Sequence, residues 1–272
     1  MRRLSPLAGL VSVLLAGCAG TAPPITLPGG PGRPIADFAT RFTSAVAECA
    51  DIRSFEALVR LQGRGGGVDV GGRVRAGFAR PASLRLEMVA PFGAPGFYFV
   101  ARPGNATLWL TREAQLLTGV PPEEIFASLT GIRLDPDDLR AVLTGCLADG
   151  PVPVAGRDHG DWIAVDLDGG AVAYLRTVDG ATRLAAGTRD RLTFEFGDFR
   201  RGLPRRVRVT SDDRLADGRF VTDLTATLSQ VNINVPLDEA VFRLDRLPED
   251  LTLITLDELR GAAPLEVPPP AR

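Results

Sequence analysis

The spacing of apolar residues along the chain changes shortly after residue 50. Between residues 35 and 49 they recur at every third or fourth position, which predicts a helix with one buried face. These residues are Ile35, Phe38, Phe42, Val46 and Cys49. After Asp51 apolar and polar residues alternate, or apolar runs lie between turn residues, which predicts strands. The first strand segments are FEALVRLQG (55–63), GRVRAGFAR (72–80), SLRLEMVAP (83–91), GFYFVARPG (96–104) and ATLWLTR (106–112).

Two helices are predicted to interrupt the strands. The segment PPEEIFASLTG (121–131) begins with proline, carries acids in its first turn and ends at Gly131. The segment LDPDDLRAVLTGC (134–146) has Asp135 as its N-cap, a proline at the next position and Gly145 near its end. Capping and the helix dipole account for the carboxylates of this second segment, which lacks the ligand spacing of a calcium loop.

Strands are predicted to resume after residue 160 and to continue to residue 245. Short strands with regular turns predict an antiparallel sheet that is curved or partly closed, and so a mainly β fold of the α+β class. The segments are DWIAVDLD (161–168), AVAYLRTV (171–178), RLTFEFGDF (191–199), PRRVRVTS (204–211), GRFVTDLTATLSQVNINV (218–235) and AVFRLD (240–245).

The first twenty residues have the layout of an export signal. A basic start precedes the apolar run 4–17, which is shorter than the ~20 residues that a membrane-spanning helix needs. The ending Leu-Ala-Gly-Cys resembles a bacterial lipobox, in which the Cys18 thiol is acylated and becomes the mature N-terminus. The alternative is an ordinary signal peptide in which Cys18 falls by chance. Ala19 follows, and by resemblance to the Gram-negative sorting rule it favours the outer membrane, with the protein facing the periplasm.

Composition divides the chain into four parts. Residues 1–17 are the signal peptide, and the Pro/Gly-rich residues 18–34 form a lipidated tether that reaches about 50 Å when extended. Residues 35–262 form the folded domain, and residues 263–272 form a loose Pro-rich tail. The tether would let the domain stand away from a membrane to which the lipid attaches it.

Charge and cysteine content limit the classes of partner. All basic residues are arginine and the net charge is −2, so there is no broad electrostatic case for nucleic-acid binding. With Cys18 assigned to lipid, Cys49 and Cys146 form an even pair in an oxidising compartment. They are either joined as a disulfide or buried as two small thiols.

Candidate catalytic chemistry is sparse. The single histidine, His159, lies in a Gly- and Asp-rich turn where it is more simply explained as a solvated residue than as a metal ligand. GRGGGVDVGG (63–72) is predicted to be a hairpin or a flexible loop, because no Lys-Ser/Thr pair follows it. The Arg-dense segment 199–209 is either a solvated strand face or a contact for anionic lipid headgroups. We therefore expect a binding protein with no metal, no cofactor and no enzymatic activity.

Two segments resemble the outer-membrane receptor family of the lipoprotein-sorting pathway (LolB-like), within the LolA/LolB-like lipoprotein carrier superfamily. LRLEMVAPFGAPGFYFVARPGN (84–105) resembles the family's strand, Pro-hydrophobic-Gly loop, strand and PGN turn. PEEIFASLTGIRLDPDDLRAVLTGC (122–146) resembles its two inserted helices. Residues 236–262 exceed a compact receptor and are more similar to other members of the superfamily.

The resemblance implies an unclosed antiparallel β-barrel with a helical lid over an apolar cavity that takes the acyl chains of client lipoproteins. A periplasmic lipoprotein carrier is then an expected partner. Phe92, between Pro91 and Gly93, matches the protruding residue that promotes membrane insertion of cargo in the family. A Phe at a loop tip can also fold back on a neighbour, and the sequence leaves both alternatives open.

Apolar residues of the strands and helices are candidates for the cavity wall. The alternation that selects them also describes a solid core, so core and cavity remain alternatives. The candidates are Leu84, Leu86, Met88, Phe97, Phe99, Leu108, Leu110, Ile125, Phe126, Leu129, Leu139 and Leu143.

Three functions compete on these observations. The first is a lipid-anchored protein that accepts lipoproteins, or a similar amphiphile, and promotes their insertion into the outer membrane. The second is a structural or assembly lipoprotein that uses the same fold as a protein-binding platform. The third, an anchored hydrolase, lacks a nucleophile–base pair in the sequence.

Overall fold

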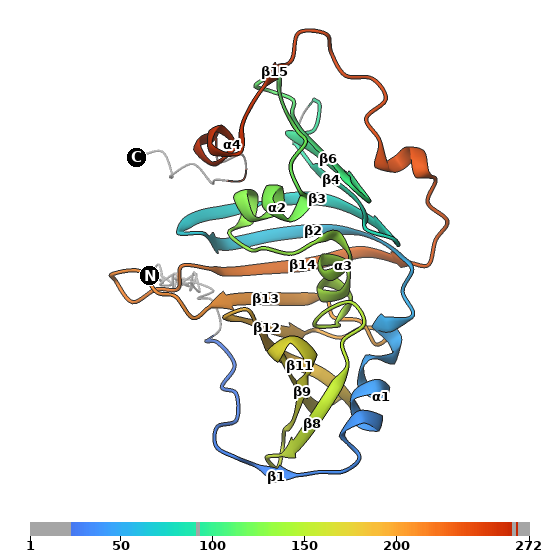
Figure 1. The fold of residues 1–272 in the computed structure, drawn as a ribbon, viewed down its shortest axis with the longest axis vertical. Helices are drawn as coiled ribbons and strands as arrows, with labels where there is room; N and C mark the ends of the chain where they lie inside the picture. Colours follow the sequence, from blue (N-terminus) through green and yellow to red (C-terminus); the bar gives the residue numbers. More distant parts are fainter. Residues whose placement is uncertain (1–22, 91–92, 263–264, 266–272) are drawn as a thin grey trace, which may run out of the picture.

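The computed structural model of the chain describes residues 23–90, 93–262 and 265. In this part of the chain a single mixed sheet is accompanied by a few helices (Figure 1). The helices are α1 (Phe38–Ala50), α2 (Pro122–Thr130), α3 (Pro136–Thr144) and α4 (Leu256–Ala262), with 3₁₀ turns η1 (Asp168–Gly170) and η2 (Glu239–Phe242). The strands are β1 (Arg33–Pro34), β2 (Ser54–Gly65), β3 (Val68–Ala79), β4 (Ser83–Met88), β5 (Phe97–Arg102), β6 (Asn105–Leu110), β7 (Gln115–Thr118), β8 (Pro153–Asp158), β9 (Ile163–Leu167), β10 (Val172–Val178), β11 (Ala181–Arg189), β12 (Leu192–Gly197), β13 (Arg206–Ser211), β14 (Asp223–Ile233) and β15 (Thr252–Leu253).

The sheet consists of two meanders joined at the centre, the first formed by β2 to β7 and the second by β8 to β14. Its strand order is β1-β8-β9-β10-β11-β12-β13-β14-β2-β3-β4-β5-β6-β7-β15. Neighbouring strands are antiparallel except at one edge, where β15 lies parallel to β7. The last strand of the second meander, β14, pairs along its length with β2, so the two meanders form one continuous surface. The sheet remains unclosed, and the expected mainly β fold with an open antiparallel sheet and helices is confirmed.

The two interrupting helices begin and end where capping residues predict. The Asp135 carboxylate accepts a hydrogen bond from the Asp138 N–H at 2.8 Å, which caps the N-terminus of α3. Gly131 and Gly145 end the two helices in the left-handed conformation, with φ of 72° and 97°. Burial is the largest influence on Asp135 and raises the pKa of its carboxyl group.

The first helix is shorter than predicted at its start. It begins at Phe38 rather than at Ile35. Residues 33–34 pair with β8, and the Ile35 N–H donates to the Gly156 carbonyl oxygen at 3.0 Å, so the chain is still extended there. Ile35 nevertheless contacts the same surface as α1, which explains why it fits the helical spacing.

Some strands were missed, and one predicted strand is wrong. The strands β7, β8 and β11 lie in segments that the alternation did not select. The strand β8 was not predicted because prolines at 151 and 153 argue against a strand. They are accepted there because β8 lies next to the edge of the sheet. Residues 240–245 form no strand. Asp238 caps the 3₁₀ turn η2 there, with its carboxylate accepting the Ala240 N–H at 2.8 Å.

The predicted tether meets the sheet at two places. Its residues 33–34 form β1, and the Ile25 N–H donates to the Glu195 carboxylate at 3.1 Å. Glu195 faces Arg208 across β12 and β13. Arg208 is only 3% exposed and forms two hydrogen bonds with Asp223. The prediction of a solvated strand face in segment 199–209 is therefore wrong at Arg208.

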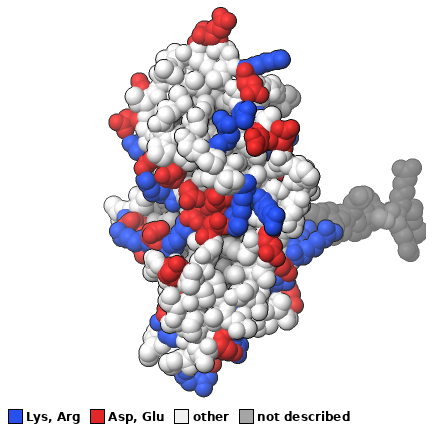
Figure 2. All heavy atoms as spheres, turned by 45° about the vertical axis from the view of Figure 1, so that its right-hand side comes forward, with Lys and Arg blue, Asp and Glu red and all other residues white. Residues whose placement is uncertain are grey.

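Charges of both signs are mixed on the surface drawn in Figure 2. Acidic side chains gather near the middle of this face, with arginines directly beside them. Over the described part of the chain many arginines contact carboxylates, for example Arg191 with Asp213 at 2.6 Å. No helix in the described part of the chain is long and apolar enough to span a membrane.

Candidate functional site

An apolar cavity lies between the sheet and the two interrupting helices. Its wall exposes no polar atom, and it encloses about 50 Å³. The sheet supplies residues from β2, β3, β4, β5 and β14, and α2 and α3 supply the opposite wall. The lining residues are Val59, Leu61, Val74, Ala76, Leu86, Phe97, Phe126, Leu129, Thr130, Leu139, Leu143, Leu224 and Leu265.

The structure divides the candidate residues between cavity and core. Those that line the cavity are Leu86, Phe97, Phe126, Leu129, Leu139 and Leu143. Those that do not line it are Leu84, Met88, Phe99, Leu108, Leu110 and Ile125. All of the second group except Met88 are at most 1% exposed and belong to the solid core. Met88 is half-buried, and its side chain lies close to Gly72 and Gly96.

Several lining residues were not among the candidates. Val59, Leu61, Val74 and Ala76 lie in segments already predicted as strands, where the same alternation could have selected them. Leu265 comes from the segment predicted to be a loose tail, where no periodicity marks it. The sequence therefore indicates which face of a strand is apolar, but not how near each residue lies to the cavity.

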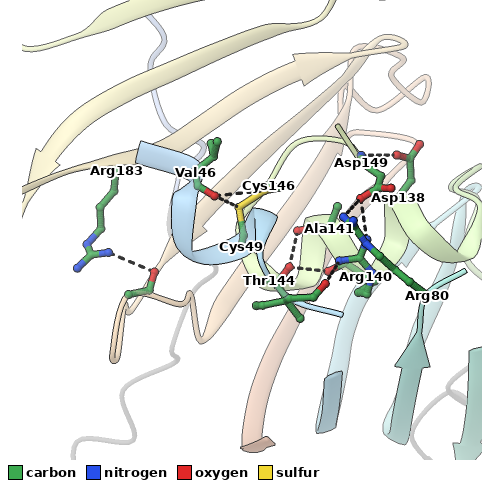
Figure 3. The surroundings of a disulfide bond; sticks show 12 residues. Val46, Cys49, Arg80, Asp138, Arg140, Ala141, Thr144, Cys146, Asp149 and Arg183 are labelled. Carbon is green, nitrogen blue, oxygen red and sulfur yellow. Dashed lines mark hydrogen bonds and ion pairs between the residues drawn. A yellow bond between two sulfur atoms is a disulfide. The ribbon is translucent and has the colours of Figure 1, made fainter. Parts of the chain in front are cut away.

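A buried arginine ties α3 to the segment between α1 and β2 and to the loop that follows α3 (Figure 3). Arg140 is 1% exposed; its guanidinium donates to the Ile52 carbonyl oxygen at 2.8 Å and to the Asp149 carboxylate at 2.7 Å. Asp149 also pairs with Arg80, which follows the last residue of β3. Next to this contact, Asp138 accepts a hydrogen bond from the Asp149 N–H at 3.0 Å and pairs with Arg189 of β11 at 2.8 Å. These contacts make α3 a fixed wall of the cavity.

A disulfide adds a covalent tie at the end of the same helix. Cys49 at the end of α1 and Cys146 just after α3 are joined, with their Cα atoms 5.8 Å apart (Figure 3). The structure thus decides between the two alternatives that the sequence left open for this pair. Because α1 packs on β8, β9 and β11, the disulfide links α3 to the second meander.

The helix α2 is held by a close backbone approach to the β2–β3 hairpin. The turn at Gly66-Gly67 has positive φ at both positions, so the hairpin prediction for 63–72 is confirmed. A Cβ at Gly65 would overlap the Thr130 carbonyl oxygen, and a Cβ at Gly131 would overlap the Gly66 nitrogen. Glycines on both sides therefore let the end of α2 lie directly on the turn.

The Gly65→Ala variant should be less stable than the parent by about 2 kcal/mol, because the added methyl group pushes the end of α2 off the hairpin. Urea denaturation followed by circular dichroism measures the change. Gly77→Ala is the matched control, since a Cβ there meets nothing within 4 Å. Equal stability of the two variants would contradict the close approach.

The remaining sequence-predicted features contribute little to this cavity. Cys18, Pro91 and Phe92 lie outside the described residues, while Gly93 has φ of 82° in the loop that follows Val89. The His159 N–H donates to the Trp162 carbonyl oxygen at 2.8 Å within its turn. Among the described residues, no cluster of three or more His, Cys, Asp or Glu side chains could hold a metal ion.

The size and chemistry of the cavity limit what it can do. Its lining contains no titratable side chain, so it offers no acid or base to a bound molecule. An apolar cavity of ~150 Å³ takes up benzene, and this one is about a third of that size at 50 Å³. In the present state it has room for only a short piece of hydrocarbon. A longer chain requires part of the wall to move.

Comparison with known proteins supports the fold. No family model matches the chain, and no curated protein matches it in sequence. Its structure is similar to that of a LolA superfamily protein from Nitrosomonas europaea, with a TM-score of 0.52 and 11% identity over 76% of this chain and 97% of that one. A DUF1329 family protein from Desulfovibrio piger has a TM-score of 0.46 and 14% identity over 78% and 97% of the two chains. Lipoprotein LppX of Mycobacterium tuberculosis has a TM-score of 0.33 and 10% identity over 74% and 97%. The fold of this chain is thus similar to that of the LolA superfamily protein from Nitrosomonas europaea.

Proposed function

We propose that this protein is a lipid-anchored carrier that holds acyl chains in the cavity beneath α2 and α3. The observation that carries the proposal is a cavity wall made of apolar side chains, placed between a bent sheet and helices. Acyl chains of a dozen exposed CH₂ groups cost on the order of 10 kcal/mol in water, and such a wall offsets that cost without directional bonds. The proposal assigns no catalytic step to the protein.

We propose that the client is a lipoprotein or a similar amphiphile, received from a periplasmic carrier and inserted into the outer membrane. The lipobox at Cys18, the LolB-like segments 84–105 and 122–146 and the fold support this role. Phe92 is the residue that we expect to enter the membrane surface during delivery, and Phe92→Ala should impair delivery while leaving stability unchanged.

A protein-binding platform is the second candidate function. The observation that favours it is the small volume of the cavity, about 50 Å³, since a platform needs no room for a guest. The two functions differ in what the purified protein retains. A platform would be recovered with envelope proteins and without lipid, whereas a carrier would be recovered with lipid or lipopeptide in its cavity.

Native mass spectrometry tests the carrier, using a protein in which a cleavable signal peptide without a lipobox replaces residues 1–18. This protein is purified from the periplasm and supplied with palmitate. All described residues are retained in this protein. We expect a bound state heavier by one fatty acid, at palmitate concentrations in the micromolar range. The absence of any bound lipid, both as purified and after palmitate addition, would leave the platform as the function.

The Val74→Phe variant should bind palmitate at least about tenfold more weakly than the parent, because the ring fills the free space of the cavity. Val154→Phe is the matched control, since Val154 is 57% exposed in β8, a strand that supplies no residue to the lining. Circular dichroism should show the same fold for both variants. Unchanged palmitate affinity in Val74→Phe would place the bound chain outside this cavity.

A further inference from the structure

The segment after β14 wraps around one edge of the sheet. It first crosses the outer face, where Phe242 is buried and the Arg85 guanidinium donates to the Val241 carbonyl oxygen at 2.8 Å. It then runs along the edge as β15 and turns to the side on which α2 lies, where it forms α4 (Figure 1). The extension thus has an outer part that is bound to the sheet and an inner part that reaches the cavity.

The inner part places apolar side chains against the cavity and the helix beside it. Leu259 is fully buried in α4, which packs against α2. Leu265 is 3% exposed and lines the cavity, although every other lining residue comes from the sheet or from α2 and α3. We call α4 together with Leu265 the C-terminal plug.

Among the residues that the structure describes, the C-terminal plug has few polar contacts with the rest of the protein. The strand β15, which precedes it, joins β7 over two residue pairs. Within the plug, the Leu265 carbonyl oxygen accepts a hydrogen bond from the Gly71 N–H at 3.0 Å. Its polar side chains bond within the segment: Thr255 with Glu258, and Asp257 with Arg260. By contrast, α3 on the opposite side of the cavity is fixed by a buried arginine and lies beside a disulfide. The plug is therefore the part of the wall that can leave at least cost.

We propose that the C-terminal plug occupies part of the acyl site in the empty protein and is displaced when an acyl chain enters. This inference rests on the proposed carrier function. The plug and a guest chain would cover the same apolar wall, so the observed affinity is the affinity of the open site reduced by the fraction of molecules that are open. The plug would also keep the site dry before loading and expel the guest on release. On this proposal the cavity is small because the plug fills the rest of the acyl site.

Binding of cis-parinaric acid, followed by its fluorescence, tests the plug in the protein lacking residues 1–18. A second deletion that ends the chain at Thr255 removes the plug, and Leu265→Ala shortens it while keeping α4. We expect affinity on the order of tenfold tighter for the deletion and an intermediate gain for Leu265→Ala. Leu253→Ala is the control in the same segment, because Leu253 is 70% exposed, and its affinity should equal that of the parent.

The outcomes separate the plug from the carrier function. If the parent binds the probe and the folded deletion or Leu265→Ala binds it equally or more weakly, the plug is a fixed wall and only this inference fails. If no variant binds the probe, the carrier function fails as well. Hydrogen exchange gives a second measure: amides of 256–262 should exchange faster with saturating probe, and slower exchange would overturn the displacement. If the deletion variant does not fold, the affinity of Leu265→Ala and the exchange measurement test the displacement of the plug.

Discussion

Loss of the bond between Cys49 and Cys146 should lower the free energy of unfolding by about 4–5 kcal/mol. The bond closes a loop with a sequence separation of 97 residues, and a loop of ~100 residues corresponds to about 4.7 kcal/mol of lost chain entropy in the unfolded state. In a domain of this size each kcal/mol corresponds to roughly 2–4 °C, so the melting temperature should fall by about 10 °C or more.

Thermal unfolding of the Cys49→Ser/Cys146→Ser protein, compared with the parent with and without reductant, measures this effect. Reductant should lower the melting temperature of the parent to that of the double variant and leave the double variant unchanged. A double variant as stable as the parent would show that contacts between α1, α3 and the second meander suffice without the bond. The comparison matters for the proposed displacement of the plug, because the bond helps to keep α3, the opposite wall of the cavity, in place.

The fold was largely accessible from the sequence because its signals are local. Asp135 with the following proline, and the glycines at 131 and 145, act through the backbone of their own helix turns, so their meaning does not depend on the rest of the protein. The strand β11 gave no such signal. Its buried residues run consecutively over 184–187, which alternation cannot detect.

The site was only partly accessible because a cavity depends on distances between elements remote in sequence. Alternation correctly placed Leu86 and Leu84 on the buried face of β4, yet only Leu86 lines the cavity. Leu265 has no periodic neighbours and reaches the cavity only because the extension wraps around the edge of the sheet. Arg208 fits an alternating solvated strand in the sequence, but its carboxylate partner Asp223 lies on the neighbouring strand β14.

Asp149→Ala should destabilise the protein by about 3 kcal/mol, because it leaves the Arg140 guanidinium buried with one carboxylate fewer. The remaining acidic contact is with Asp137, at 3.6 Å, and the Ile52 carbonyl oxygen still accepts one hydrogen bond. The expected loss is at the low end for a buried charge, since the Asp149 side chain keeps 32% of its surface exposed and water can replace part of the contact.

The double variant Arg140→Met/Asp149→Ala should recover most of this loss. Methionine fills a similar volume and removes the charge that has lost one carboxylate in the single variant. The Ile52 carbonyl oxygen then loses a donor and Asp137 loses its contact with Arg140. The lost pair between Asp149 and Arg80 is common to both variants. Arg133→Ala is the control for an exposed pair: Arg133 is 61% exposed beside Glu124, and its removal should cost less than about 1 kcal/mol. Urea denaturation of the parent, Arg140→Met, Asp149→Ala and the double variant gives the coupling energy directly. If the double variant is less stable than Asp149→Ala, the arginine stabilises α3 through packing and its bond to Ile52, and the ion pair is not what fixes this wall of the cavity.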